Sequence, residues 1–136
     1  MIYFLDTGPL VSALAHNEPA FGPWAKDLFR SIPTPLHTCE PVLTEAAHFL
    51  GTPEPILAAL ADGLIVCSWT LPENHARVRE LVAKYADQPM DLADACLVAM
   101  SELRWDCKVV TVDVEDFTVY RRRGRHSIPL ITPPET

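Results

Sequence analysis

The chain has few basic residues for its acidic content. Eleven lysines and arginines face eighteen aspartates and glutamates, so the formal net charge is −7. A protein this acidic is not expected to coat nucleic acid through a general positive surface. It also lacks any apolar run near the ~20 residues that a membrane-spanning helix needs. Its apolar start has no basic segment and is interrupted by Asp6, which argues against an export signal. We therefore expect a cytoplasmic protein.

The four cysteines and five histidines show no close pairing along the chain. Zinc sites of the Cys/His type normally show tight ligand spacing, such as two cysteines three positions apart. Reduced cysteines packed as small apolar side chains are the expected interpretation. The chain has 136 residues, of which 49% are hydrophobic. One domain of this size buries a core without help from a metal or a disulfide.

Short apolar runs alternate with amphipathic segments throughout the sequence. The runs at 2–5, 36–38, 64–67, 108–112 and 130–131 predict strands, and helices are expected near 7–14, 21–31, 41–50, 52–61, 72–86, 90–103 and 114–120. Such alternation predicts an α/β fold with a parallel sheet and helices on both of its faces. Residues 1–131 are expected to form the single domain, and 132–136 a loose tail.

Two acidic residues directly follow expected strands. Asp6 comes after 2–5, and Asp113 comes after 108–112. In an open parallel α/β sheet, ligands bind beyond the carboxyl ends of the strands, so neighbouring strands would bring these two carboxylates together. An aspartate at a strand end can also be only the N-cap of the next helix. Both interpretations stay open for each residue taken alone.

Two further acids lie on the apolar faces of expected helices. Asp94 has mainly apolar neighbours three and four positions away, and a carboxylate there is costly to bury without a compensating cation or donors. Helix-dipole stabilisation explains Asp91 well and Asp94 less well. Glu45 also lies among apolar residues, and the alternative for it is an edge position from which its side chain reaches solvent.

Four clustered carboxylates would repel one another and raise each other's pKa. A hard divalent cation removes that penalty, and ligands that are all oxygen select Mg²⁺ or Mn²⁺ rather than zinc. Magnesium held by few carboxylates is the usual arrangement for phosphate chemistry. The acidic residues therefore predict metal-assisted phosphoryl hydrolysis.

Four ordered segments carry a resemblance that covers nearly the whole chain. They are LDTGPLV at 5–11, VLTEAA at 42–47, MDLADA at 90–95 and VTVD at 110–113, with Asp116 and Phe117 after the last. Together they resemble PIN-domain ribonucleases and, within them, the VapC-type toxins of bacterial type II toxin–antitoxin pairs. The resemblance implies a three-layer α/β/α sandwich with a central, mostly parallel sheet.

The same resemblance implies a function and its residues. The chain would be an endoribonuclease that cleaves RNA phosphodiester bonds by activated water, using one or two Mg²⁺ or Mn²⁺ ions. The resemblance assigns metal binding and catalysis to an acidic quartet and supporting roles to four more residues: Asp6, Glu45, Asp94 and Asp113, then Thr7, Asp91, Thr111 and Asp116. It also implies a protein antitoxin and a homodimer.

Four arginines fall close together near the end of the chain: Arg121, Arg122, Arg123 and Arg125. Without them, seven bases would face the eighteen acids. Because the cluster follows Asp113 closely, we expect it to bind substrate as a phosphate clamp beside the metal site. A solvated loop or a contact surface for a partner is the alternative.

Other functional classes fit less well. A phosphatase of the haloacid dehalogenase type needs a second aspartate two residues after the first, where this chain has Gly8. A phospho-acceptor receiver domain needs an aspartate after the third strand, and residues 67–70 supply none. A housekeeping PIN-type RNA-processing nuclease and a non-catalytic interaction protein with a silent acidic site both remain open.

Overall fold

The structure, a computed structural model, describes residues 1–135. Its elements follow the chain in this order: β1 (Ile2–Leu5), α1 (Thr7–Leu14), α2 (Gly22–Ser31), β2 (Leu36–His37), α3 (Glu40–Leu50), α4 (Glu54–Ala61), β3 (Ile65–Val66), α5 (Leu71–Lys84), α6 (Leu92–Leu103), β4 (Cys107–Val110), α7 (Val114–Val119), β5 (Arg121–Arg122), β6 (His126–Ser127) and β7 (Leu130–Ile131). Residues 132–135 of the expected tail form no helix or strand, and position 136 lies outside the described residues.

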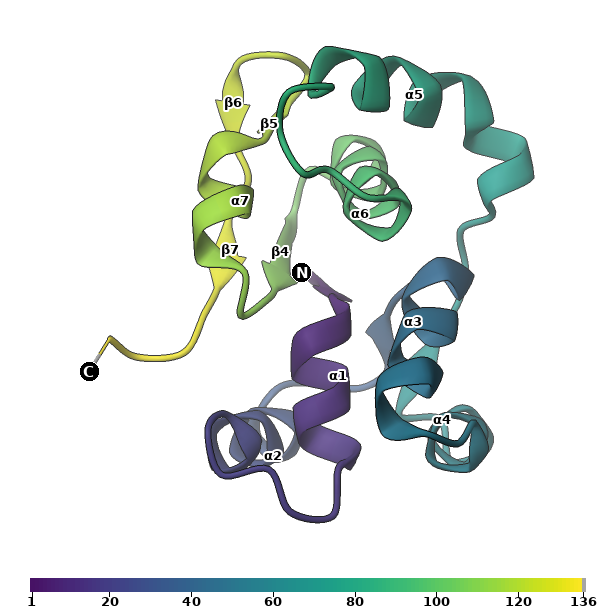
Figure 1. The fold of residues 1–136 in the computed structure, drawn as a ribbon, viewed down its shortest axis with the longest axis vertical. Coiled ribbons are helices and arrows are strands. Elements are labelled where there is room, and N and C mark those ends of the chain that lie inside the picture. Colours follow the sequence, from purple (N-terminus) through teal and green to yellow (C-terminus); the bar gives the residue numbers. More distant parts are fainter. Residues whose placement is uncertain (136) are drawn as a thin grey trace.

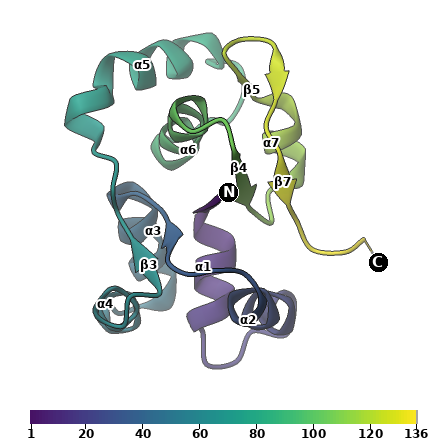
Figure 2. The same ribbon diagram turned by 180° about the vertical axis from the view of Figure 1, so that it is seen from behind.

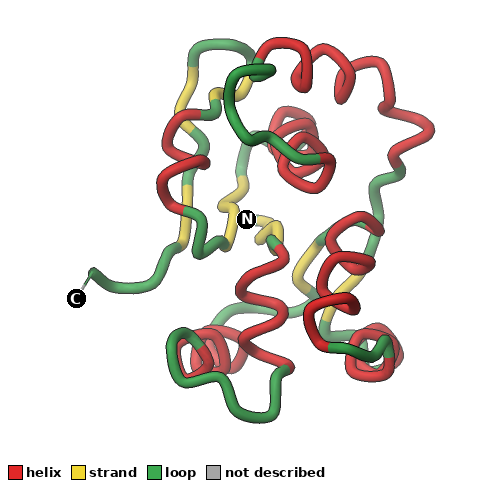
Figure 3. The backbone as a smooth tube through the Cα atoms, in the orientation of Figure 1, coloured by secondary structure: helices red, strands yellow, loops and turns green. Residues whose placement is uncertain are grey.

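The central sheet has the strand order β3-β2-β1-β4-β7, and all of its neighbouring strands are parallel. Helices α1 to α4 gather on one side of the strands and α5 to α7 on the other (Figures 1 and 2). Figure 3 shows how short the strands are compared with the helices around them. The expected α/β fold, a parallel sheet flanked by helices in a three-layer sandwich, is confirmed.

Helix α6 forms the centre of the core. All of its residues from Ala93 to Glu102 are buried, and it packs against α5, β4 and β1. Burying one Leu or Val side chain stabilises the fold by about 1.5–3 kcal/mol. The same burial holds Asp94, in the first turn of α6, at a fixed position against the sheet. Within the described residues, no helix is long and apolar enough to cross a bilayer.

Two local features differ from the sequence expectations. Strand β4 ends at Val110 rather than at residue 112, so Asp113 lies in the turn beyond the strand. Beyond Thr111 the Asp113 N–H bonds to the Thr111 hydroxyl at 2.9 Å, and such a local turn bond competes with the sheet ladder. The arginine cluster belongs to an antiparallel hairpin of β5 and β6, with Arg121 and Arg122 in β5 and with Arg123 and Arg125 in the exposed turn. Arg123 and Gly124 turn the chain there, with φ of 55° and 78°, values that tight hairpin turns require.

Candidate metal site

Three helices begin at the candidate site, and an aspartate stands at each start. The Asp6 side chain accepts a hydrogen bond from the Thr7 N–H (2.8 Å), and the Asp91 side chain accepts one from the Asp94 N–H (2.8 Å). Asp113 is the N-cap residue of α7 but makes no such bond. The N-cap interpretation therefore holds for the Asp6 side chain without excluding a site. Helix N-termini also favour negative charge, so they stabilise the clustered carboxylates.

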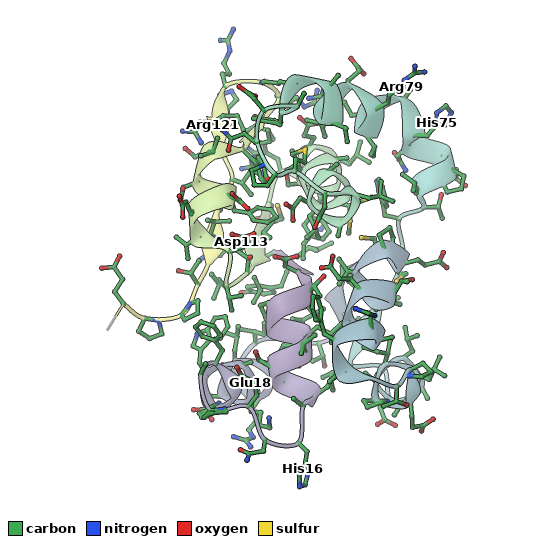
Figure 4. The ribbon with its side chains drawn as sticks, in the orientation of Figure 1. His16, Glu18, His75, Arg79, Asp113 and Arg121 are labelled. Carbon is green, nitrogen blue, oxygen red and sulfur yellow. The ribbon has the colours of Figure 1, made fainter. Side chains whose placement is uncertain are left out.

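One pocket collects the acidic quartet. It has a volume of about 570 Å³ and lies at the carboxyl ends of β1 and β4. Its acidic lining residues are Asp6, Glu18, Glu45, Asp91, Asp94 and Asp113. Figure 4 shows Asp113 next to the start of α1, the helix that follows Asp6. The structure thus brings together the four residues that the sequence singled out, from four separate elements.

Asp6 is fixed by two threonines. Its side chain is only 6% exposed, and its Oδ2 accepts a hydrogen bond from the Thr111 hydroxyl at 2.7 Å. The same hydroxyl oxygen accepts the Asp113 N–H at 2.9 Å, so Thr111 ties the two acids together. Burial raises the pKa of Asp6 to about 6, against the lowering effect of the hydrogen bonds from Thr111 and Thr7. The Thr7 hydroxyl is buried without a partner among the described residues.

Asp94 is the most strongly perturbed acid of the site. Burial, followed by the negative charges of Asp91 and Asp6, raises the pKa of Asp94 to about 8. The fully buried Tyr120 donates its hydroxyl to Asp94 Oδ2 at 2.9 Å, which opposes that rise. Sequence reasoning missed Tyr120. Tyr120 lies three positions after Phe117, a spacing that places both side chains on one face of a helix. This spacing was a signal that Tyr120 is buried, and a buried tyrosine hydroxyl needs a hydrogen-bond partner.

Three aspartates come closest to a metal-binding geometry. Carboxylate oxygens of Asp94, Asp113 and Asp116 lie within 4.8 Å of one another. Burial, followed by the hydrogen bond and the charge of Asp116, raises the pKa of Asp113 to about 6. This group could hold a metal ion. Asp116, expected to have a supporting role, belongs to it, whereas Asp6 and the half-buried Glu45 line the pocket around it.

The donor set fits a hard divalent cation. All candidate ligands are carboxylate oxygens, the ligands that Mg²⁺ and Mn²⁺ prefer. The raised pKa values of Asp6, Asp94 and Asp113 show that the cluster disfavours its own negative charge. A bound cation would reverse that preference, because an opposite charge nearby favours the ionised form.

Comparison with known proteins adds no identification. No model of a protein family matches the chain, and no curated protein matches it. The ordered motifs and the geometry of the pocket are therefore the features of this chain that bear on its function.

Glu18 lines the pocket but was not expected there. Its Oε2 accepts hydrogen bonds from the Phe21 N–H (2.7 Å) and the Gly22 N–H (2.6 Å). These bonds cap the start of α2, where the first N–H groups lack partners within the helix. Glu18 therefore has a structural reason to be where it is, and we do not count it as a metal ligand.

Two of the four clustered arginines, Arg122 and Arg123, lie at the far end of α6 from Asp94, so these two form no clamp beside the metal site, and a substrate role for the cluster stays a prediction. Arg122 is 5% exposed, and its guanidinium donates to the carbonyls of Ser101 (3.3 Å) and Trp105 (2.8 Å). Arg123 donates to the Glu102 carbonyl at 3.1 Å. These bonds satisfy carbonyls at the C-terminal end of α6, where positive charge is favoured. Asp94 is eight residues away at the other end, about 12 Å along the helix axis.

The other two arginines differ from each other. Arg121 donates to the carbonyls of Thr118 (2.6 Å) and Tyr120 (3.0 Å), so it caps the end of α7. Arg125 is exposed on the hairpin. The expected role in substrate binding therefore fits exposed Arg125 best, whereas buried Arg122 stabilises the fold.

Proposed function

We propose that the protein is a metal-dependent endoribonuclease and the toxin half of a type II toxin–antitoxin pair. One observation carries the proposal: a single pocket at the strand ends collects Asp6, Glu45, Asp94 and Asp113. Two of these acids, together with Asp116, have the spacing of a metal site. The ordered motifs that resemble PIN-domain ribonucleases support the assignment to RNA cleavage and to a toxin.

The residues of the pocket have two proposed roles: some bind the metal ion and others orient the metal-binding side chains. Asp94, Asp113 and Asp116 would hold Mg²⁺ or Mn²⁺, and Asp6 and Glu45 would complete the site or place a second ion. A bound ion supplies a water of lowered pKa and stabilises charge on the phosphate. Tyr120 and Thr111 fix the orientation of Asp94 and Asp6 through their hydroxyls, a supporting role that tunes metal sites. If Glu45 does not place a second ion, it would orient the attacking water from its position in the pocket.

The pocket also limits the substrate. A phosphodiester is negatively charged and would be repelled by the bare carboxylates, so substrate binding should depend strictly on the cation. Single-stranded or loop RNA fits best, because its backbone is free to enter a pocket. An antitoxin that covers the pocket, a homodimer and a cytoplasmic location belong to the same proposal.

The direct test is cleavage of a single-stranded RNA with mapping of the ends formed. Wild type should cleave with Mg²⁺ or Mn²⁺ and stop when EDTA is added. Asp94→Asn should lower kcat/KM by ~100-fold or more, the several kcal/mol expected for loss of a metal ligand. Asp62→Asn, an exposed acid at the end of α4, is the matched control and should cleave normally. Equal cleavage by wild type and Asp94→Asn would exclude this site as the nuclease.

Two further measurements separate the alternatives. In a calorimetric titration with Mn²⁺, a silent acidic site would show no binding, or binding that Asp6→Asn leaves unchanged. Expression in cells should arrest growth for wild type and not for Asp94→Asn. Rescue by the product of the adjacent reading frame would distinguish a toxin from a housekeeping nuclease.

A further inference from the structure

We infer that the β5–β6 hairpin and the adjoining end of α6 form a second RNA-binding surface that acts without metal. We call it the hairpin surface and define it by five residues: Lys84, Trp105, Arg123, Arg125 and His126. The inference rests on the proposed function for its choice of RNA. Its site, however, is separate from the acidic pocket, and its test does not require cleavage.

Trp105 is the aromatic platform of the hairpin surface. Its side chain is 47% exposed although it is large and apolar. The Arg122 guanidinium carbon lies 3.7 Å from the centre of the Trp105 ring, and the His126 ring approaches edge-on with centroids 5.2 Å apart. The ring is therefore held in place while nearly half of it faces solvent. Such a preorganised ring suits base stacking, which contributes about 1–3 kcal/mol per base.

Three cationic side chains surround the hairpin turn. Lys84, at the end of α5, places its Nζ 3.5 Å from the Gly124 carbonyl. Arg123 and Arg125 flank that glycine, and all three cationic residues are exposed. The combination of a backbone-tracking positive surface with a stacking aromatic is typical of proteins that bind single strands without sequence preference.

Two carboxylates adjoin this surface, and each has a cationic partner. Asp106, next to Trp105, pairs with the N-terminal amine at 3.1 Å, and Glu102 pairs with Arg77. Glu102 is 7% exposed. Its two oxygens accept the Arg77 guanidinium at 2.7 Å each, and Oε2 also accepts the Arg123 N–H at 2.6 Å. Glu102 therefore holds the hairpin in place and does not present its charge to a ligand. A local positive surface thus exists on a chain whose net charge is −7.

Single-stranded RNA fits this surface better than an acidic protein does. An acidic protein would need only cationic side chains to bind here. The exposed Trp105 next to those cations offers, in addition, a ring on which a nucleic-acid base can stack. The hairpin lies at the opposite end of α6 from Asp94, and Figure 4 shows Arg121 apart from Asp113. The separation along α6 is about 12 Å, short enough for one RNA strand to contact both places.

The test measures RNA binding in EDTA, where the acidic pocket has no metal. A fluorescein-labelled oligouridylate is titrated with protein at several sodium chloride concentrations, and anisotropy gives the affinity. The double variant Lys84→Ala/Arg125→Ala should bind more weakly at every salt concentration. It should also flatten the slope of log K against log salt by about 1.4, since each lost contact removes ~0.7 for a single strand. Arg79→Ala, an exposed arginine elsewhere on α5, should change neither quantity (Figure 4).

Trp105 has a test of its own. Trp105→Leu should weaken binding about tenfold, the loss expected for one stacked base. Because that change also removes the stacking partner of Arg122, thermal melting must show that the variant folds. If it does not, the double variant decides, because both of its side chains are exposed.

Four outcomes would overturn the inference: no RNA binding in EDTA, an unchanged salt slope in the double variant, an equal loss in Arg79→Ala, or tighter binding of oligoglutamate than of oligouridylate. The proposed function fails by a different result, an absence of metal-dependent cleavage that needs Asp94. Asp94→Asn should keep the binding measured in EDTA, so the two failures are distinguishable.

Discussion

Asp94 should make the metal-free protein less stable as the pH rises. The ordinary pKa of its carboxyl is 3.8, and the fold raises that pKa to about 8, mainly by burial. The folded protein therefore holds a proton that the unfolded chain releases, and the stabilisation is complete below pH 3.8 and lost as the pH rises toward about 8. Each pH unit within this window costs about 1.4 kcal/mol. Between about pH 5 and about pH 8 the free energy of unfolding should fall by about 4 kcal/mol through Asp94.

Asp94→Asn isolates this effect, because an amide does not titrate and its oxygen can still accept the Tyr120 hydroxyl. Urea denaturation followed by circular dichroism, in EDTA at both pH values, gives the free energy of unfolding. The variant should be more stable than wild type near pH 8 and should lose much less stability on going from pH 5. Adding Mg²⁺ at ~100 times its Kd should stabilise wild type by about 2.7 kcal/mol and the variant by much less.

The result that would refute this reasoning is a wild-type stability that does not change with pH relative to Asp94→Asn. Lower stability of the variant near pH 8 would refute it as well. Either result would mean that the carboxylate is ionised and well compensated in the metal-free fold. The pocket would then give no energetic reason to recruit a cation.

Two further predictions concern residues that position the site and the hairpin. A Cβ at Gly8 would lie 2.5 Å from Val112 Cγ2, so Gly8→Ala should cost about 1–3 kcal/mol of stability by overpacking; Gly8→Ala/Val112→Ala should recover it in the same urea titration. Glu102→Gln weakens the bidentate pair with Arg77, whose side chain is 39% exposed, and should cost about 1.5–3 kcal/mol, the loss of hydrogen bonds to a charged group, measured by thermal melting. Glu80→Gln, which removes an exposed acid 4.0 Å from Arg77, should change the melting temperature little.

Much of the fold followed from local patterns in the sequence. Alternating apolar runs and amphipathic segments predict strands and helices because side-chain periodicity reports directly on the period of each element. The parallel sheet then follows from the connections between the strands. The ends of the elements were less certain: β4 stops at Val110, and the Asp113 N–H bonds to the Thr111 hydroxyl, which Asp6 at the end of the neighbouring strand holds in place. No pattern within 108–112 carries that information.

The candidate site, like the fold, could be predicted from the sequence only in part. Asp6, Glu45, Asp94 and Asp113 could be found in the sequence, because a strand end and an apolar helix face are local properties that make a carboxylate conspicuous. Their meeting in one pocket was a consequence of the parallel topology. The topology does not determine which three carboxylates come within metal-binding distance, since that depends on side-chain directions from α6 and α7.

The positions of the arginines depend on contacts between distant parts of the chain. Their spacing in sequence from Asp113 suggested a clamp at the pocket, but the hairpin turns the chain back to the far end of α6. There Arg122 donates to the Ser101 carbonyl of α6 and to the Trp105 carbonyl beyond it, and stacks on the face of Trp105. The acidic residues and the sheet that gathers them could be read from the chain alone, because both depend on short-range periodicity. The hydrogen bonds from Tyr120 to Asp94 and from Thr111 to Asp6, and the contacts of Arg122, became visible only in the fold, because contacts between residues far apart in the chain leave no local pattern.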